Sequence, residues 1–225
     1  MNSLARRLAA EGLGSFFLFA TVIGSGTMAE TLASGNVALS LLGNTMATGA
    51  ILFVLIAMLG PVSGAHFNPA VTMVMAARCD LGRRDVLPYI LAQLIGGLLG
   101  AWAAHLMFDL PILQYSLKAR TGVGQWAGEF IATFGLILTI LGTLKHRPVA
   151  VPASVALYIT AAYWFTSSTS FANPAITIVR SLSNSFAGIA PAHVPMFIVA
   201  QLLGAIAAAI AGKLLFDRDR PEAVS

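Results

Sequence analysis

Long apolar runs with almost no charge dominate the chain. Six of them approach or exceed the roughly 20 residues that a helix needs to cross a hydrocarbon core about 30 Å thick. The runs lie near residues 8–28, 37–59, 86–108, 125–144, 148–165 and 194–216. The pattern predicts an all-α membrane protein with six transmembrane helices. It also predicts a single domain over residues 1–225, because little chain remains for a soluble one.

Two shorter apolar segments begin with Asn-Pro-Ala, at Asn68 and Asn173. Asn followed by Pro is typical of the N-cap and first residue of a helix. The segments end near residues 78 and 182, so each is too short to span the bilayer. We therefore expect two re-entrant half-helices. Backbone at that depth is tolerated only where it is buried in protein or lines a wet cavity.

The two halves of the chain resemble each other. Three landmarks recur in the same order: 10–16 resembles 128–134, 67–72 resembles 172–177, and 92–96 resembles 200–204. Each half holds three spans, an odd number, so the second half must be inverted in the membrane. We expect inverted repeats over about 1–115 and 120–220, with the two Asn-Pro-Ala turns meeting near the midplane.

The charged residues are few and are placed between the spans. The chain is 57% apolar and 10% charged, with a net charge of +4. Because the Lys and Arg side chains fall mainly in alternate short links, this charge indicates both termini in the cytoplasm and no nucleic-acid partner. A single cysteine, Cys79, excludes an intrachain disulfide and a cysteine metal cluster. No nucleophile–base pair, metal-ligand cluster or phosphate loop is visible, so we predict no enzyme, metal or cofactor.

The paired Asn-Pro-Ala turns suggest the chemistry of a pore. Two helix N-termini that face one point repel cations there, whereas a neutral solute is not repelled. The side-chain amides of Asn68 and Asn173 can donate hydrogen bonds to water or to a hydroxylated solute. The alternative is that each Asn is only an N-cap. Its repetition in an inverted repeat favours the pore.

Two acidic residues lie inside predicted spans and need partners. We expect Glu11 and Glu129 each to accept hydrogen bonds from backbone N–H groups of a re-entrant loop. The alternative function is a proton-coupled secondary transporter in which these two glutamates carry protons. His66, beside the first Asn-Pro-Ala, has a similar pair of interpretations, as a loop scaffold or a proton relay.

Residues 63–72, Ser-Gly-Ala-His-Phe-Asn-Pro-Ala-Val-Thr, resemble the first signature of the aquaporin and aquaglyceroporin family, and the resemblance spans essentially the whole chain. It implies a right-handed bundle of six helices and two half-helices, embedded in lipid. It also implies a homotetramer in the bacterial inner (plasma) membrane. Each subunit would hold one pore for passive flow of water and small uncharged solutes.

The second Asn-Pro-Ala departs from this family. It is normally followed by an arginine that narrows the outer pore, and here that residue is Ile176. The other filter positions implied by the resemblance are Thr48, Ser170 and, on the fifth span, either Ile159 or Ala161. Such a filter is wide and weakly polar. The departure therefore implies passage of polyols, urea and neutral metalloid hydroxides together with water.

Arg180 is a further candidate for the filter. It lies about 10 Å along the half-helix from Asn173, against about 4.5 Å for Ile176, and on the same face. It either restores a positive charge at the outer mouth or extends to the membrane interface. Residues 173–182 and the Ser/Thr-rich loop before them also resemble bacterial aquaporins associated with arsenic resistance. That resemblance implies passage of neutral arsenite or methylated arsenicals.

Overall fold

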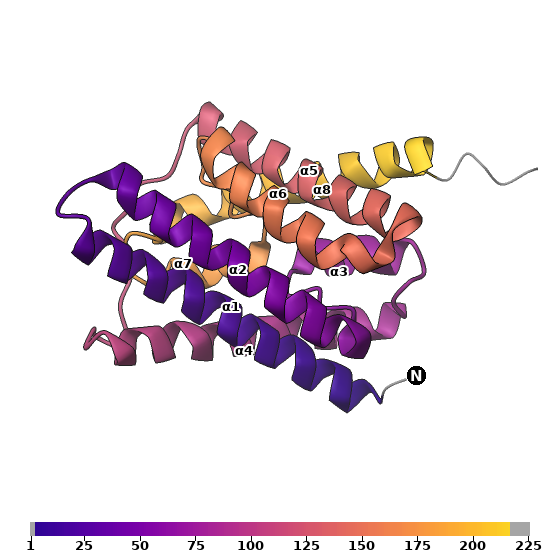
Figure 1. Cartoon of the computed structure of the whole chain (residues 1–225), viewed down its shortest axis with the longest axis horizontal. Coiled ribbons are helices and arrows are strands. Elements are labelled where there is room, and N and C mark those ends of the chain that lie inside the picture. The colour runs from indigo at the N-terminus through magenta and orange to yellow at the C-terminus, as the bar shows by residue number, and fades with distance from the viewer. Residues whose placement is uncertain (1–2, 217–225) are drawn as a thin grey trace, which may run out of the picture.

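The computed structural model describes residues 3–216, and six of its helices are long and apolar enough to cross a membrane, as the sequence predicts. The long helices are α1 Leu4–Leu32, α2 Val37–Ser63, α4 Val86–Met107, α5 Val123–His146, α6 Val151–Phe165 and α8 Val194–Phe216. Two short helices, α3 Pro69–Ala77 and α7 Pro174–Arg180, lie among them (Figure 1). Short 3₁₀ turns precede α4, α6 and α8, and the turn before α6 completes a span of 18 residues.

The two halves of the chain are arranged as an inverted repeat. The start of α1 and the end of α8 lie at the same end of the bundle, whereas α3 and α7 extend toward the middle from opposite ends (Figure 1). The predicted inversion is confirmed in the fold. The last residues of the expected second repeat, 217–220, lie outside the described part of the chain.

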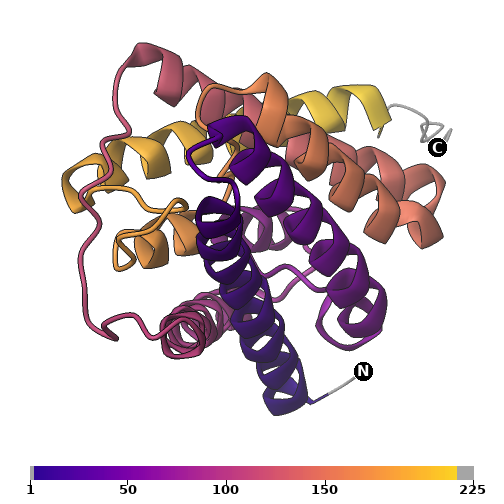
Figure 2. The ribbon, with the colours of Figure 1, turned by 60° about the vertical axis from the view of Figure 1, so that its left-hand side comes forward.

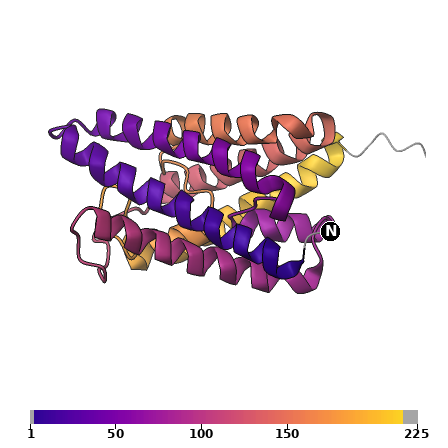
Figure 3. The ribbon, with the colours of Figure 1, turned by 60° about the horizontal axis from the view of Figure 1, so that its bottom comes forward.

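Matching glycines let the helices of each half pack closely. A Cβ atom on Gly96 of α4 would lie 2.0 Å from the carbonyl oxygen of Gly12 in α1. A Cβ atom on Gly204 of α8 would lie 2.4 Å from the carbonyl oxygen of Phe130 in α5. Figure 3 shows the two helices of the first contact, with indigo α1 running across magenta α4. Both glycines end the repeated sequence Ala-Gln-Leu-x-Gly, so this close approach is a property of the repeat.

The half-helices begin where the sequence predicts, because each Asn caps its own helix. The Asn68 side chain accepts a hydrogen bond from the Ala70 N–H at 2.9 Å. The Asn173 side chain accepts from the N–H groups of Ala175 and Ile176 at 3.0 and 3.3 Å. Both asparagines are extended, and a proline follows each at the first helical position.

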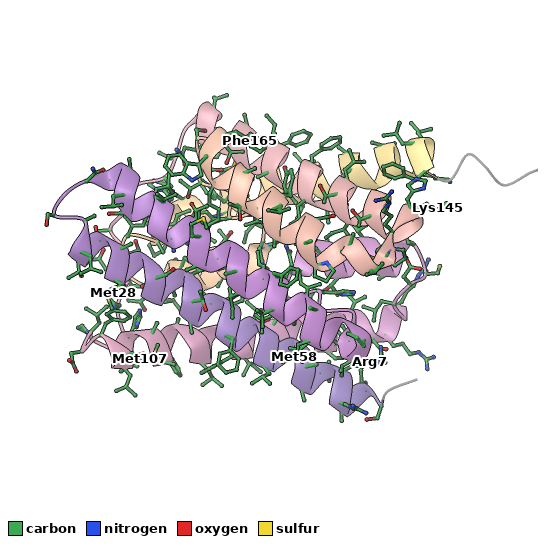
Figure 4. All side chains as sticks on the ribbon, in the orientation of Figure 1. Arg7, Met28, Met58, Met107, Lys145 and Phe165 are labelled. Atoms are coloured by element: carbon green, nitrogen blue, oxygen red, sulfur yellow. The ribbon has the colours of Figure 1, made fainter. Side chains whose placement is uncertain are left out.

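The outer surface of the bundle is apolar, as a membrane protein requires. Large side chains such as Phe53, Leu99 and Leu203 are about half exposed on the long helices. Figure 4 shows Arg7 and Lys145 at the end where α1 begins. The helix faces between the two ends therefore suit a hydrocarbon environment.

Candidate functional site

The two Asn-Pro-Ala turns meet and hold each other. The side-chain nitrogen of Asn68 donates to the carbonyl of Ala172 at 2.7 Å. The side-chain nitrogen of Asn173 donates to the carbonyl of Phe67 at 2.8 Å. An amide nitrogen carries two hydrogens, so each asparagine keeps one further donor. Both asparagines also line a central cavity, and this donor is the polar group that they can offer to a solute.

The loops that precede Asn68 and Asn173 share an unusual backbone conformation. Ala65 and Phe67 have φ of 50° and 48°, and their counterparts Ser170 and Ala172 have φ of 50° and 47°. This left-handed region costs a non-glycine residue free energy and persists only where its surroundings impose it. Two of these four residues supply the carbonyls that the opposite asparagine holds. Their strain is therefore balanced by contacts within the site.

Glu11 is fully buried and holds the first loop. Its carboxylate accepts the backbone N–H groups of His66 and Phe67 at 2.9 and 2.8 Å. It also accepts the Ser63 hydroxyl at 2.7 Å and the Gln93 side-chain amide at 2.8 Å. The carboxylate therefore accepts hydrogen bonds from four donors, two of them from the loop backbone. The loop is thus fixed to α1 and α4.

Glu129 has the same arrangement in the second half. Its carboxylate accepts the backbone N–H groups of Phe171 and Ala172 at 2.8 and 2.9 Å. The Gln201 side chain donates to it at 2.5 Å and to the Thr177 hydroxyl at 2.8 Å. Glu11 and Glu129 are both absent from the wall of the central cavity. The hydrogen bonds of both carboxylates go to the loops and to the supporting helices, and not to the cavity.

His66 lies in the wall of the cavity, and the network fixes its hydrogen-bonding role. Its Nδ1 is 3.2 Å from the Thr72 hydroxyl. That hydroxyl donates to the Asn68 carbonyl at 2.9 Å, just as Thr177 donates to Asn173 in the other half. Nδ1 must then be the donor to Thr72. A neutral His66 consequently keeps its other ring nitrogen, Nε2, as an acceptor.

The central cavity lies between the two loops, and residues of both loops line it. Its volume is about 110 Å³, several times the roughly 10–15 Å³ that one water molecule needs on this measure. Eight of the predicted site residues line it: Thr48, His66, Asn68, Ile159, Ser170, Asn173, Ile176 and Arg180. Most of the remaining wall is apolar. A second cavity of about 570 Å³ shares His66 and Met75 with it and includes Arg7 and Lys145 at the end where α1 begins.

The fifth span contributes Ile159 and not Ala161. Ala161 is exposed on the outside of α6, because two residues along a helix turn a side chain by about 200°. Of the two alternatives that the sequence left open, Ile159 is thus the one in the cavity wall. Tyr163 also lines the cavity, and its hydroxyl donates to the Thr48 hydroxyl at 3.3 Å. Sequence reasoning missed Tyr163, although its spacing of four residues from Ile159 places both on one helix face.

Arg180 is buried and lines the central cavity. Its side chain is 1% exposed, so the interpretation that it extends to the membrane interface is wrong. Nε donates to the Ala187 carbonyl, and the guanidinium carbon lies 3.3 Å from the centre of the Phe171 ring. Ile176, one turn nearer to Asn173, is also buried and lines the cavity.

Comparisons with known proteins agree over most of the chain. Residues 1–167 match the profile of the major intrinsic protein family. The chain is 53% identical over 218 residues to aquaglyceroporin AqpS of Rhizobium meliloti (strain 1021), covering 97% of this chain and 93% of that one. It is 31% identical over 241 residues to aquaporin AqpM of Methanothermobacter thermautotrophicus, covering 93% and 97%.

A solved structure shares the fold. The X-ray structure of the aquaglyceroporin from Plasmodium falciparum superposes with a TM-score of 0.70, covering 96% of this chain and 97% of that one. Sequence identity in this pair is 19%, so it supports the fold alone.

Proposed function

Because the chain belongs to the major intrinsic protein family, we propose that it is a passive channel whose filter admits uncharged solutes larger than water. Membership makes the protein an integral membrane channel for water and small solutes such as glycerol, and not an enzyme. The proposal adds the solute range, which comprises polyols, urea and neutral metalloid hydroxides such as arsenite.

The observation that carries this proposal is the side chain directly after the second Asn-Pro-Ala. Ile176 is 5% exposed and gives the outer part of the cavity an apolar wall. The same region holds the hydroxyls of Thr48, Tyr163 and Ser170. The Ser170 hydroxyl is buried and has no hydrogen-bond partner within residues 3–216. A ring with one apolar side, a Thr48–Tyr163 hydroxyl pair and the unpaired Ser170 hydroxyl suits a solute that carries both hydroxyl groups and carbon or metalloid surface.

Arg180 supports exclusion of ions in this proposal. Its two Nη nitrogens make no hydrogen bond within the described residues, although its Nε is held by Ala187. Because Arg180 lines the cavity, those nitrogens are donors for an oxygen atom of a passing solute. A positive charge there, together with the N-termini of α3 and α7, opposes cations.

The proton-coupled transporter is supported less well. Glu11 and Glu129 are 0% exposed, and neither lines the cavity. The oxygens of each carboxylate are occupied by donors from the loop that it holds and from a glutamine side chain. This arrangement supports a scaffolding role for the two glutamates. A solute in the cavity would have no direct contact with either carboxylate.

The test is the substitution Ile176→Arg in proteoliposomes under gradients of glycerol or urea, with Ile176→Leu as an apolar control of equal volume. We expect the arginine variant to lose most of its permeability to these solutes while it keeps water permeability, and the leucine variant to keep both. Unchanged solute uptake in Ile176→Arg would place the filter elsewhere. Uptake by the wild type that saturates at low turnover or follows a proton gradient would establish a transporter.

The proposal also covers the oligomeric state of the channel, its membrane and the side on which its termini lie. We propose a homotetramer in the bacterial inner membrane with both termini in the cytoplasm. The basic residues Arg7 and Lys145 at one end of the bundle support this orientation of the termini. Cross-linking in membranes and labelling of tagged termini test the two parts separately.

A further inference from the structure

We propose that Arg120 is a positioning residue for the outer filter, holding Arg180 in place and adding a second positive charge beside it. Arg120 belongs to the link between α4 and α5 and was not a candidate on sequence grounds. The inference rests on the proposed function, since it assumes that Arg180 lies at the filter.

The link that carries Arg120 runs beside the segment that follows α7 (Figure 2). The Ser116 N–H donates to the Ser181 carbonyl at 2.9 Å, and the Ala190 N–H donates to the Lys118 carbonyl at 2.7 Å. These two backbone bonds join the link to the segment at both of its ends. Arg120 follows directly and extends inward from this paired region.

Arg120 ties three separate pieces of chain together. Its side chain is 8% exposed, and its Nε donates to the Gly188 carbonyl at 2.8 Å. Its Nη1 donates to the Ser168 carbonyl at 3.1 Å and approaches the Thr169 hydroxyl at 3.4 Å. The link, the second re-entrant loop and the segment after α7 therefore share one guanidinium.

The Arg120 guanidinium also contacts groups next to those that Arg180 contacts. Arg120 and Arg180 hold consecutive carbonyls, those of Gly188 and Ala187. Both also lie against the ring of Phe171, at 5.0 and 3.3 Å from its centre, within the range of cation–π attraction. Movement of Arg120 would release the carbonyl next to the one that Arg180 holds. The position of Arg180 thus depends on Arg120.

The two arginines also concentrate positive charge. Within residues 3–216, neither forms a salt bridge with a carboxylate. Glu129 lies behind them and gives its oxygens to the N–H groups of Phe171 and Ala172 and to a glutamine side chain. A cation at the outer mouth would therefore meet two positive charges that are not neutralised by direct pairing.

Lys118 offers a matched control from the same link. Its Nζ donates to the Phe186 carbonyl at 2.7 Å and lies 4.4 Å from the centre of the Phe186 ring. It makes no contact of this kind with Phe171. Lys118→Gln removes one positive charge from the same link together with its contact to the Phe186 carbonyl. It leaves in place the Arg120 contacts with the Gly188 and Ser168 carbonyls.

The experiment compares Arg120→Gln, Arg120→Lys and Lys118→Gln in proteoliposomes. It measures the ratio of glycerol to water permeability and the proton leak reported by a trapped pH-sensitive dye. For Arg120→Gln we expect a change in the ratio and a leak raised about tenfold, the size expected for one poorly screened charge. Arg120→Lys keeps the charge and loses the planar fork, so its leak stays low while its ratio changes. We expect Lys118→Gln to resemble the wild type in both the permeability ratio and the proton leak.

The outcomes separate the two proposals. A wild type that conducts neither glycerol nor urea refutes the proposed function itself. A wild type that conducts them, with an unchanged ratio in Arg120→Lys, overturns the positioning role, whether or not Arg120→Gln folds. An equal rise in leak for Lys118→Gln and Arg120→Gln would overturn the assignment of the charge effect to Arg120 beside the Phe171 ring.

Discussion

Replacing Glu129 with glutamine should destabilise the fold strongly although the side chain keeps its shape. One carboxylate oxygen accepts the Phe171 N–H, and the other accepts the Ala172 N–H and the Gln201 amide. The new amide group is least harmful when its nitrogen faces Phe171, which leaves one buried N–H without a partner at a cost of about 1–3 kcal/mol. The two remaining bonds lose their charge assistance, about 1 kcal/mol each.

The expected loss is therefore about 3–5 kcal/mol in the free energy of unfolding. SDS titration of the purified protein, followed by circular dichroism, measures this difference. Glu30→Gln is the matched control, because Glu30 is exposed near the C-terminal end of α1 and the same substitution there should change little.

A small effect of Glu129→Gln on stability would refute the role of Glu129 as a scaffold for the second loop. If Glu129→Gln unfolds within about 0.5 kcal/mol of the wild type, the loop does not depend on the carboxylate. If the variant also loses solute uptake that the wild type couples to a proton gradient, Glu129 carries protons and the transporter alternative is correct.

Two further predictions concern packing and pH. Gly96→Ala should destabilise the bundle by at least about 2 kcal/mol, because its Cβ would lie 2.0 Å from the backbone oxygen of Gly12. Gly60→Ala, with no atom within 4 Å of its Cβ, should not, and SDS titration compares them. Burial and the charge of Arg120 lower the pKa of Lys118 from 10.5 to about 8. The unfolded chain then binds more protons between these pH values, so stability should rise from pH 8 to 10.5. Lys118→Gln should remove this rise, and an equal rise in the variant would contradict the assignment.

Much of the fold follows from signals that are local in the sequence. Spans of apolar residues set the six long helices, and an Asn-Pro pair sets the start of each half-helix. The inverted repeat follows from counting spans in two similar halves. Glu11 and Glu129 could be assigned partners in advance, because a buried carboxylate beside loop N–H groups leaves few other arrangements.

The filter was harder to predict, since its members come from segments that meet only in three dimensions. Counting back from Asn173 to the fifth span crosses a loop of unknown shape, and this uncertainty allowed both Ile159 and Ala161. Helix periodicity from Ile159 would have found Tyr163. Nothing in the sequence around Arg120 indicates that it lies against Phe171, because the link that carries it has no periodic pattern.

The reciprocal bonds between the two Asn-Pro-Ala turns have a consequence for biosynthesis. Asn68 needs a carbonyl from residue 172, and Asn173 needs a carbonyl from residue 67. When the first three spans have left the ribosome, the first turn still has no acceptor for its amide. We therefore expect the first half of the chain to remain in a hydrated, protease-sensitive state until the last spans are inserted. Both turns would then become ordered in a single late step of assembly.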